Sequence, residues 1–293
     1  MEPQSKTNET ILLSDVNNTG LLTLFCRAAD SRRADRIIND PMAVTIAERL
    51  IPIIAESDDE MLSLLSQGKV DPQVTVHIAL RAAKYDQFAR DFLVTHPDGI
   101  IVNLGCGLDS RFHRLGDAKL EFFDLDLPEV IRLKRRLIEE TERYHLLAYS
   151  VLDFRWMDEL SSFAHRPILF LAEGLFMYLK PDDVKGLVRE LLVRFPGSEL
   201  VCEVFNSAWL KGAWGALVHR KLQQRLKMGK EAQFHSGLAH PREMEEWDPR
   251  IQYVDDWSYF DTGHMRLGAF RFLKSIPLFR NIQYTVQYKL LGE

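Results

Sequence analysis

The spacing of apolar residues changes at about residue 100 of this 293-residue chain. Before that point, apolar side chains recur at helical spacing in three stretches, at about 15–26, 42–51 and 71–94. Asn39-Asp40-Pro41 is a helix-start signal in front of the second stretch. Residues 58–68 show no clear pattern. We therefore expect a helical cap, or lid, placed before a sheet.

After residue 100, short apolar runs alternate with helical segments. The fourth run is apolar throughout, as expected for a strand that is buried on both faces. Strands that alternate with helices favour a doubly wound, mostly parallel α/β sheet. The five runs that we predict as strands lie at 100–104, 120–124, 144–149, 167–172 and 199–204.

The last third of the chain is less regular. Residues 208–228 predict a helix with basic residues gathered late, 233–249 a polar loop, and 265–274 a further helix. Two more strands are predicted at 251–257 and 283–291. The second of them alternates apolar and polar residues, which is typical of an antiparallel strand at a sheet margin.

These elements predict a seven-stranded, Rossmann-like α/β sheet with an antiparallel C-terminal strand. We expect one domain over residues 1–293, with the helical cap at about 11–97 and the α/β core at about 98–206. A helical insertion and the last strands would then occupy about 207–293.

Composition and charge exclude several classes of protein. A net charge of −5 argues against a surface devoted to nucleic acid. No run approaches the ~20 apolar residues of a membrane span, and the first ten residues carry no secretory apolar region, so we expect a cytoplasmic protein. The three cysteines are far apart, and the nine histidines show no paired-ligand spacing, so we expect no metal site.

The first predicted strand leads into a glycine turn, Gly105-Cys106-Gly107. Glycine accepts a positive φ and lets a ligand approach the bare backbone. Such a turn alone is weak evidence, because a plain turn has the same residues. Cys106 offers a backbone N–H, and a thiol near a helix N-terminus can also have a lowered pKa, so redox sensing is a minor alternative.

Acidic residues follow the second, third and fourth predicted strands: Asp124 with Asp126, then Asp153, then Glu173. Ligands of open α/β sheets bind outside the carboxyl ends of the strands. A carboxylate there can accept hydrogen bonds from a ribose diol, and Asp153 could accept one from an adenine amine. The alternative interpretation is that these acids are helix caps or solvated charges.

Three segments carry a resemblance to a known family: residues 103–111 (NLGCGLDSR), 123–130 (FDLDLPEV) and 172–179 (AEGLFMYL). Together they resemble the leucine carboxyl methyltransferase family, including its bacterial branch of tetracenomycin-type polyketide O-methyltransferases. The likeness extends from about residue 21 to 204. It implies a class I S-adenosylmethionine-dependent methyltransferase with a helical addition before the sheet.

The resemblance also implies roles for single residues. Arg81, on the helix before the first strand, matches the arginine that holds the methionine carboxylate of the cofactor. A guanidinium can hold a carboxylate through two parallel hydrogen bonds. The other cofactor positions are the Gly105, Cys106 and Gly107 turn, Asp126 for the ribose with Asp124 as the fallback, Asp153 and Phe154 for adenine, and Glu173 for the amino end.

The acceptor side is less defined. Tyr178, Tyr85 and His264 are candidates for binding the acceptor, with His77 and Tyr259 as further possibilities. No catalytic residue can be assigned, because a carboxylate acceptor is ionised at neutral pH and requires no base. A phenol acceptor would benefit from one.

The favoured function is therefore methyl transfer from S-adenosylmethionine to a carboxyl or hydroxyl group of a small molecule. A polyketide-like molecule is one candidate for this acceptor. Three alternatives stay open: an NAD(P)-dependent oxidoreductase, a methyltransferase of protein C-terminal carboxylates, and a non-catalytic binding protein with the same fold. The dinucleotide motif has three glycines, and this turn has two. A homodimer also stays open.

Overall fold

The computed structural model describes residues 18–117, 119–210, 234–276 and 280–292. Seven strands form one sheet in the order β3-β2-β1-β4-β5-β7-β6. Strands β3 to β5 along this order are parallel, β7 runs antiparallel to β5, and β6 runs antiparallel to β7. The strands are β1 (Ile100–Leu104), β2 (Glu121–Asp126), β3 (Tyr144–Ala148), β4 (Ile168–Ala172), β5 (Glu199–Phe205), β6 (Ile251–Trp257) and β7 (Gln283–Leu290). The mostly parallel sheet with an antiparallel ending is confirmed.

The centre of the sheet explains the continuous apolar runs of the sequence. Every residue of β1 and β4 is buried, because helices cover both faces. Parallel pairing aligns the strand ends, with Asn103 beside Asp124 and Leu104 beside Leu125. The residues that follow β1, β2 and β4 therefore meet at one edge of the sheet.

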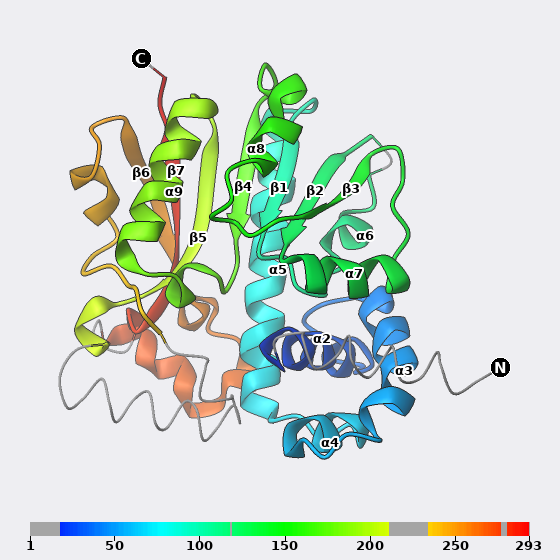
Figure 1. Ribbon diagram of the computed structural model, residues 1–293. Coiled ribbons are helices and arrows are strands. Elements are labelled where there is room, and N and C mark those ends of the chain that lie inside the picture. The colour runs from blue at the N-terminus through cyan, green and yellow to red at the C-terminus, as the bar shows by residue number, and fades with distance from the viewer. Residues whose placement is uncertain (1–17, 118, 211–233, 277–279, 293) are drawn as a thin grey trace.

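From residue 18 on, where the described part of the chain begins, four helices precede the sheet: α2 (Asn18–Ser31), α3 (Pro41–Ile54), α4 (Glu60–Ser66) and α5 (Pro72–Thr95). Figure 1 shows α2, α3 and α4 together at one end of the sheet, with the long α5 running from them along the sheet. Side-chain oxygens of Asp40, Asp59 and Asp71 cap the N-termini of α3, α4 and α5. The short α4 falls where the sequence showed no pattern.

The remaining helices that the structure describes lie within and after the sheet. They are α6 (Arg111–Leu115), α7 (Pro128–Leu137), α8 (Trp156–Glu159) and α9 (Pro181–Arg194), with 3₁₀ helices η1 (Ser161–Phe163), η2 (Phe176–Tyr178), η3 (Ser207–Trp209), η4 (Glu243–Glu246), η5 (Tyr259–Thr262) and η6 (Met265–Ser275). The predicted α-helix at 265–274 is instead 3₁₀, because Gly268 interrupts it at φ 59 and ψ −132. Most of the predicted helix at 208–228 lies outside the described residues.

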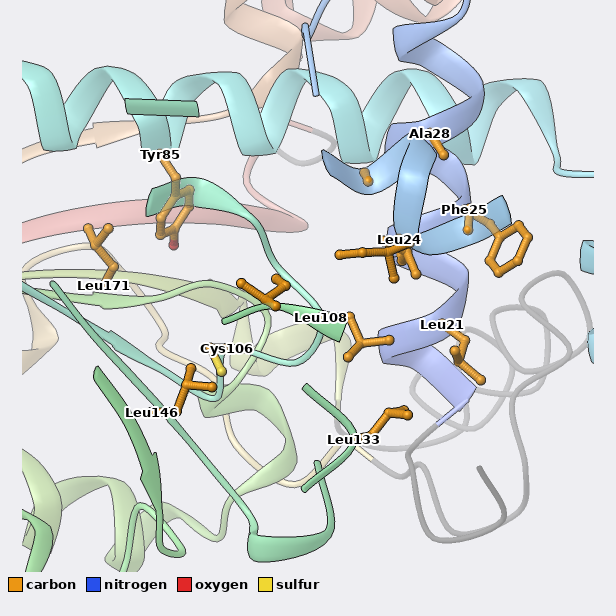
Figure 2. Close-up of a cluster of buried hydrophobic side chains, with 14 of the residues drawn as sticks. Leu21, Leu24, Phe25, Ala28, Tyr85, Cys106, Leu108, Leu133, Leu146 and Leu171 are labelled. Atoms are coloured by element: carbon orange, nitrogen blue, oxygen red, sulfur yellow. The ribbon is translucent and has the colours of Figure 1, made fainter. Parts of the chain in front are cut away.

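Two apolar clusters occupy the two faces of the sheet. Alternate residues of β1 separate into them, with Ile101 in one and Ile100 and Val102 in the other. The first cluster joins the sheet to the N-terminal helices. Figure 2 shows Leu21 and Leu24 of α2 close to Leu108, which follows the glycine turn.

In the described part of the chain, no helix has both the length and the apolar character that a bilayer crossing requires.

Candidate functional site

A cavity of about 770 Å³ opens at the carboxyl ends of β1, β2 and β4. Its walls come from the strand ends and from α2, α5, η2 and η5. The volume is within the range of about 300–1,000 Å³ that is usual for small-molecule sites. The lining is polar at the strand ends and aromatic towards η5 and β7.

The glycine turn forms the floor of the polar end. Gly105 has φ 66 and Gly107 has φ 51, a backbone region that side chains with a Cβ rarely adopt. A Cβ on Gly105 would lie 2.9 Å from Cδ1 of Leu175. The N–H groups of Gly105 and Cys106 donate to the carbonyl oxygen of Leu125, at 2.8 and 3.1 Å. These bonds fasten the turn to the end of β2, and they engage the Cys106 N–H that the sequence suggested for a ligand.

Asp126, at the end of β2, lines the cavity. The N–H of Gly107 donates to its Oδ2 at 2.7 Å, and the N–H of Leu127 donates to its Oδ1 at 2.8 Å. These bonds fix the carboxylate while each oxygen keeps further acceptor capacity. Burial raises the pKa of Asp126, although both N–H groups oppose the shift.

Asp124 does not line the cavity, which contradicts its use as a fallback for the ribose. It is buried below the turn, where Asn103 Nδ2 donates to Oδ1 at 2.8 Å and the Tyr144 hydroxyl donates to Oδ2 at 2.6 Å. The Lys134 ammonium lies 2.8 Å from the same Oδ2. Asp124 is therefore occupied by partners within the fold.

Arg81 projects from α5 into the cavity wall between two carboxylates. Its Nε donates to Glu173 Oε1 at 2.8 Å, and its Nη1 donates to Glu203 Oε2 at 2.9 Å. Arg111 Nη2 donates to the other oxygen of Glu173 at 2.6 Å. Burial would lower the pKa of Arg81, but Glu203 and Glu173 outweigh it, so the guanidinium stays charged. Glu203 was missed from the sequence, where it lies within a mainly apolar strand that also begins with an acid, Glu199.

Further buried charges join the N-terminal helices to this wall. Arg27 of α2 donates from Nε to Asp40 at 3.1 Å and from Nη2 to the carbonyl oxygen of Leu108 at 2.8 Å. Arg27 and Asp109 both line the cavity, and neither was singled out from the sequence. Burial alone would raise the pKa of Asp109, but Arg111 and Arg114 hold it well below its usual range.

The adenine pair that the resemblance implied lies outside the cavity lining. Asp153 is paired with the side chain of Arg155, whose Nε donates to Oδ1 at 2.8 Å. Phe154 packs against the apolar cluster on one face of the sheet. Ser150 and Val151, just before them, line the cavity instead. The cavity lining from this segment therefore comes from residues a few positions earlier in the chain than the resemblance implied.

Two of the three acceptor candidates also lie elsewhere. Tyr85 is fully buried, and its hydroxyl donates to the carbonyl oxygen of Ala172 at 3.4 Å. Figure 2 shows its ring within the apolar cluster beside Leu171. His264 lies outside the lining, and its Nδ1 accepts from the backbone N–H of Arg266 at 3.3 Å. Only Tyr178 lines the cavity as expected.

The aromatic end of the cavity contains Tyr178, whose ring centroid lies 5.4 Å from that of Phe234. His77 and Tyr259 face each other there, with ring centroids 4.3 Å apart. Burial and the neighbouring Arg81 lower the pKa of His77 to about 3, so its imidazole is neutral near pH 7. The remaining aromatic lining residues are Phe205, Phe260 and Phe270.

Cys106 is buried at the turn, and Figure 2 shows it among apolar side chains near Leu146. Burial and the charge of Asp124 raise the pKa of its thiol well above the usual range. The possibility of a lowered pKa is therefore wrong, because desolvation outweighs the helix N-terminus. Among the described residues, no group of His, Cys, Asp and Glu side chains could hold a metal ion.

The model of the leucine carboxyl methyltransferase family matches residues 20–192 of the chain. The chain belongs to this family. The match spans the glycine turn, Asp126 and Glu173, which carried the resemblance in the sequence.

Two relatives extend the match over nearly the whole chain. The "tetracenomycin polyketide synthesis O-methyltransferase TcmP" of Streptomyces glaucescens is 31% identical over 255 residues, which are 87% of each protein. The "S-adenosyl-L-methionine-dependent methyltransferase dpfgK" of Gibberella zeae is 29% identical over 277 residues, covering 92% of this chain and 90% of the relative. These matches confirm the expectation of an S-adenosylmethionine-dependent methyltransferase.

A solved structure shows the same fold. The crystal structure of a DUF574 family protein from Streptomyces avermitilis superposes with a TM-score of 0.55 at 16% sequence identity. The match covers 84% of this chain and 96% of that one. At this low identity the likeness supports the fold alone.

Proposed function

We propose that this methyltransferase binds S-adenosylmethionine at the polar end of the cavity and methylates an oxygen atom of a small molecule at the aromatic end. One observation carries the proposal. A single cavity joins the glycine turn, Arg81, Asp126 and Glu173 to an aromatic wall.

The polar end fits the cofactor at each of its parts. The Asp126 carboxylate is held by backbone N–H groups and keeps acceptor capacity for the two hydroxyls of a ribose. Gly105 keeps the turn at a positive φ, which lets its backbone lie at the cavity wall where the cofactor would bind. Ser150 and Val151 border the place for the base.

The amino-acid part of the cofactor fits the charged wall. Arg81 lines the cavity, and no described residue accepts a hydrogen bond from its Nη2, which suits the binding of a carboxylate. The Glu173 carboxylate would face the ammonium group, and its two guanidinium partners fix its position. The wall therefore presents a cation and an anion in the order that an amino acid requires.

The bound cofactor supplies an activated methyl group on a sulfonium, so the protein needs mainly to align the acceptor oxygen with it. His77 is neutral near pH 7 because its pKa is lowered to about 3, and so it is a weak base. A carboxylate acceptor is already ionised and needs no base. The aromatic lining favours a flat, apolar acceptor, in keeping with the polyketide named in the relative from Streptomyces glaucescens.

The test uses S-adenosylmethionine with a tritiated methyl group, added with the protein to an extract of the source organism. Small molecules and proteins are then separated and counted. We expect the label in the small-molecule fraction, and we expect alkaline hydrolysis to release it as methanol if the product is an ester. Label confined to the protein fraction would overturn the proposal in favour of a protein acceptor.

The aromatic wall gives a second readout. Tyr178→Ala removes a ring from the aromatic end, where Tyr178 packs against Phe234. The variant should transfer label at least about tenfold more slowly at low acceptor concentration while S-adenosylhomocysteine still binds as in the wild type. An equal loss of cofactor binding would contradict the division of the cavity into two ends.

A further inference from the structure

Glu203 is a buried acid in β5 that neither the sequence motifs nor the family match singles out. It lies outside residues 20–192 and is only 2% exposed. Its Oε2 accepts from Arg81 Nη1 at 2.9 Å, and its Oε1 accepts from Gln283 Nε2 of β7 at 2.7 Å. The backbone N–H of Gly174 also donates to this carboxylate. An acid held by three groups from separate parts of the chain has a fixed position.

The two acids at Arg81 differ in their charge balance. Glu173 is shared between Arg81 and Arg111, so it has two cations. In the part of the chain that the structure describes, Arg81 is the cation that pairs with Glu203. Its other partners, Gln283 and the Gly174 amide, are neutral. Glu203 therefore depends on Arg81 for its charge, and Arg81 depends on Glu203 for the placement of its Nη1.

We propose that Glu203 is the positioning residue of the cofactor carboxylate site: it fixes Arg81 from the β5 side and leaves the guanidinium open to the cavity. This rests on the proposed role of Arg81 in cofactor binding. Glu173 fixes Nε on one side, and Glu203 fixes Nη1 on the other. With both bonds made, the plane of the guanidinium cannot rotate, and Nη2 keeps its place at the cavity wall.

The same arrangement couples cofactor binding to a proton. A carboxylate bound at Arg81 comes close to Glu203, and two like charges in one buried site favour protonation of one of them. Burial and Glu173 already raise the pKa of Glu203, against the opposing charge of Arg81. The other titratable neighbours are Tyr85 of α5, Tyr178 of η2 and Cys202 of β5, whose pKa values are raised, so they stay neutral. Affinity for the carboxylate should fall as the pH rises through the pKa of Glu203.

Calorimetric titrations of the full chain with two ligands isolate the contribution of Glu203 to binding the amino-acid part of the cofactor. S-adenosylhomocysteine carries the amino acid, whereas 5′-methylthioadenosine has the same nucleoside without it. Glu203→Ala should weaken the affinity for S-adenosylhomocysteine at least about tenfold. The affinity of this variant for 5′-methylthioadenosine should stay within about twofold of the wild-type value. Equal weakening of both ligands would show that Glu203 merely supports the fold, and unchanged binding of both would show that Arg81 is fixed without it.

Glu203→Gln removes the charge but keeps an acceptor for Arg81, since the Gln283 amide can turn over to accept from the new amide. For the wild type, affinity for S-adenosylhomocysteine should fall at least about threefold as the pH rises through the raised pKa of Glu203, and this fall should be absent in the variant. The same pH dependence in both proteins would overturn the coupling. This variant decides the proposal even if Glu203→Ala does not fold.

Arg81→Ala distinguishes the failure of this inference from that of the proposed function. If that variant binds S-adenosylhomocysteine as the wild type does, Arg81 is not the cofactor anchor, and both proposals fall. If Arg81→Ala weakens binding and Glu203→Ala does not, the anchor stands and only the role of Glu203 is overturned.

Discussion

At the scale of single residues, two acids on one strand have different tasks. Asp124 and Asp126 both follow the apolar part of β2, and only the family resemblance ranked Asp126 before Asp124 for the ribose. Asp124 is enclosed with Lys134 and Tyr144, whereas Asp126 reaches the cavity. The difference comes from the glycine turn, whose Gly107 N–H holds Asp126 at the surface of the site.

Their isosteric variants should therefore separate binding from stability. Asp126→Asn should weaken adenosine binding at least about tenfold. It should cost about 1–2 kcal/mol of unfolding free energy, because the new amide can accept from only one of the two N–H groups that Asp126 binds. Asp124→Asn should cost about 3–5 kcal/mol of unfolding free energy, because the buried Lys134 charge loses its partner. Calorimetry and urea unfolding measure the two effects. If Asp124→Asn lost adenosine binding and Asp126→Asn lost more unfolding free energy, the placement of the two side chains would be contradicted.

His77 should make the protein sensitive to acid. Its pKa is about 3 in the folded state, and an unfolded histidine titrates near 6.5. The unfolded state therefore binds more protons below about pH 6.5, so stability is lost as the pH falls from there towards 3. Between about pH 7 and 5, His77→Phe should lose about 2 kcal/mol less of its unfolding free energy than the wild type, as measured by urea unfolding. Equal losses would show that His77 titrates normally.

At the scale of elements, long and strongly patterned segments could be predicted from the sequence. The strands at 100–104 and 251–257 have the bounds expected, and α5 differs from its prediction by about one residue at each end. Two short elements were harder. The seven residues of α4 are too few to show a helical period, and the glycine that breaks η6 leaves the apolar spacing unchanged.

The glycine turn between β1 and α6 can be tested against a glycine in a helix. Gly105→Ala should destabilise the protein by about 1–3 kcal/mol and abolish binding of S-adenosylhomocysteine, because Gly105 has φ 66 and its Cβ would meet Leu175. Gly186→Ala in α9 is the matched control, since its Cβ would meet nothing within 4 Å. That change should stabilise the helix by about 0.5–1 kcal/mol. Thermal unfolding of both variants checks this contrast.

The attachment of the N-terminal helices depends on one buried cap. Asp40 caps α3 and also accepts from Arg27, Ser110 and Arg114. Asp40→Ala should therefore lower the free energy of unfolding by about 3–5 kcal/mol, as expected for a broken buried ion pair. Asp59→Ala removes the exposed cap of α4 and should cost only about 1 kcal/mol. Similar losses in urea unfolding would contradict a special role for the Asp40 network.

At the scale of the whole molecule, the strand order brings together residues that are far apart in the chain. Arg81, Gly105, Asp126, Glu173 and Tyr178 were named from the sequence, and all five line one cavity. The sequence could not show Arg27, Glu203 or Gln283, because these residues come from a helix and from strands outside the recognisable motifs. Tyr85 was misjudged because α5 turns that side chain into the core.

The central claim is that this cavity binds the cofactor of a methyltransferase, with Arg81 at the amino acid and Asp126 at the ribose. Calorimetric titration with S-adenosylhomocysteine tests it most directly. The wild type should bind one molecule per chain, and Arg81→Ala and Asp126→Ala should each weaken binding at least about tenfold. Wild-type affinity in both variants would contradict the account.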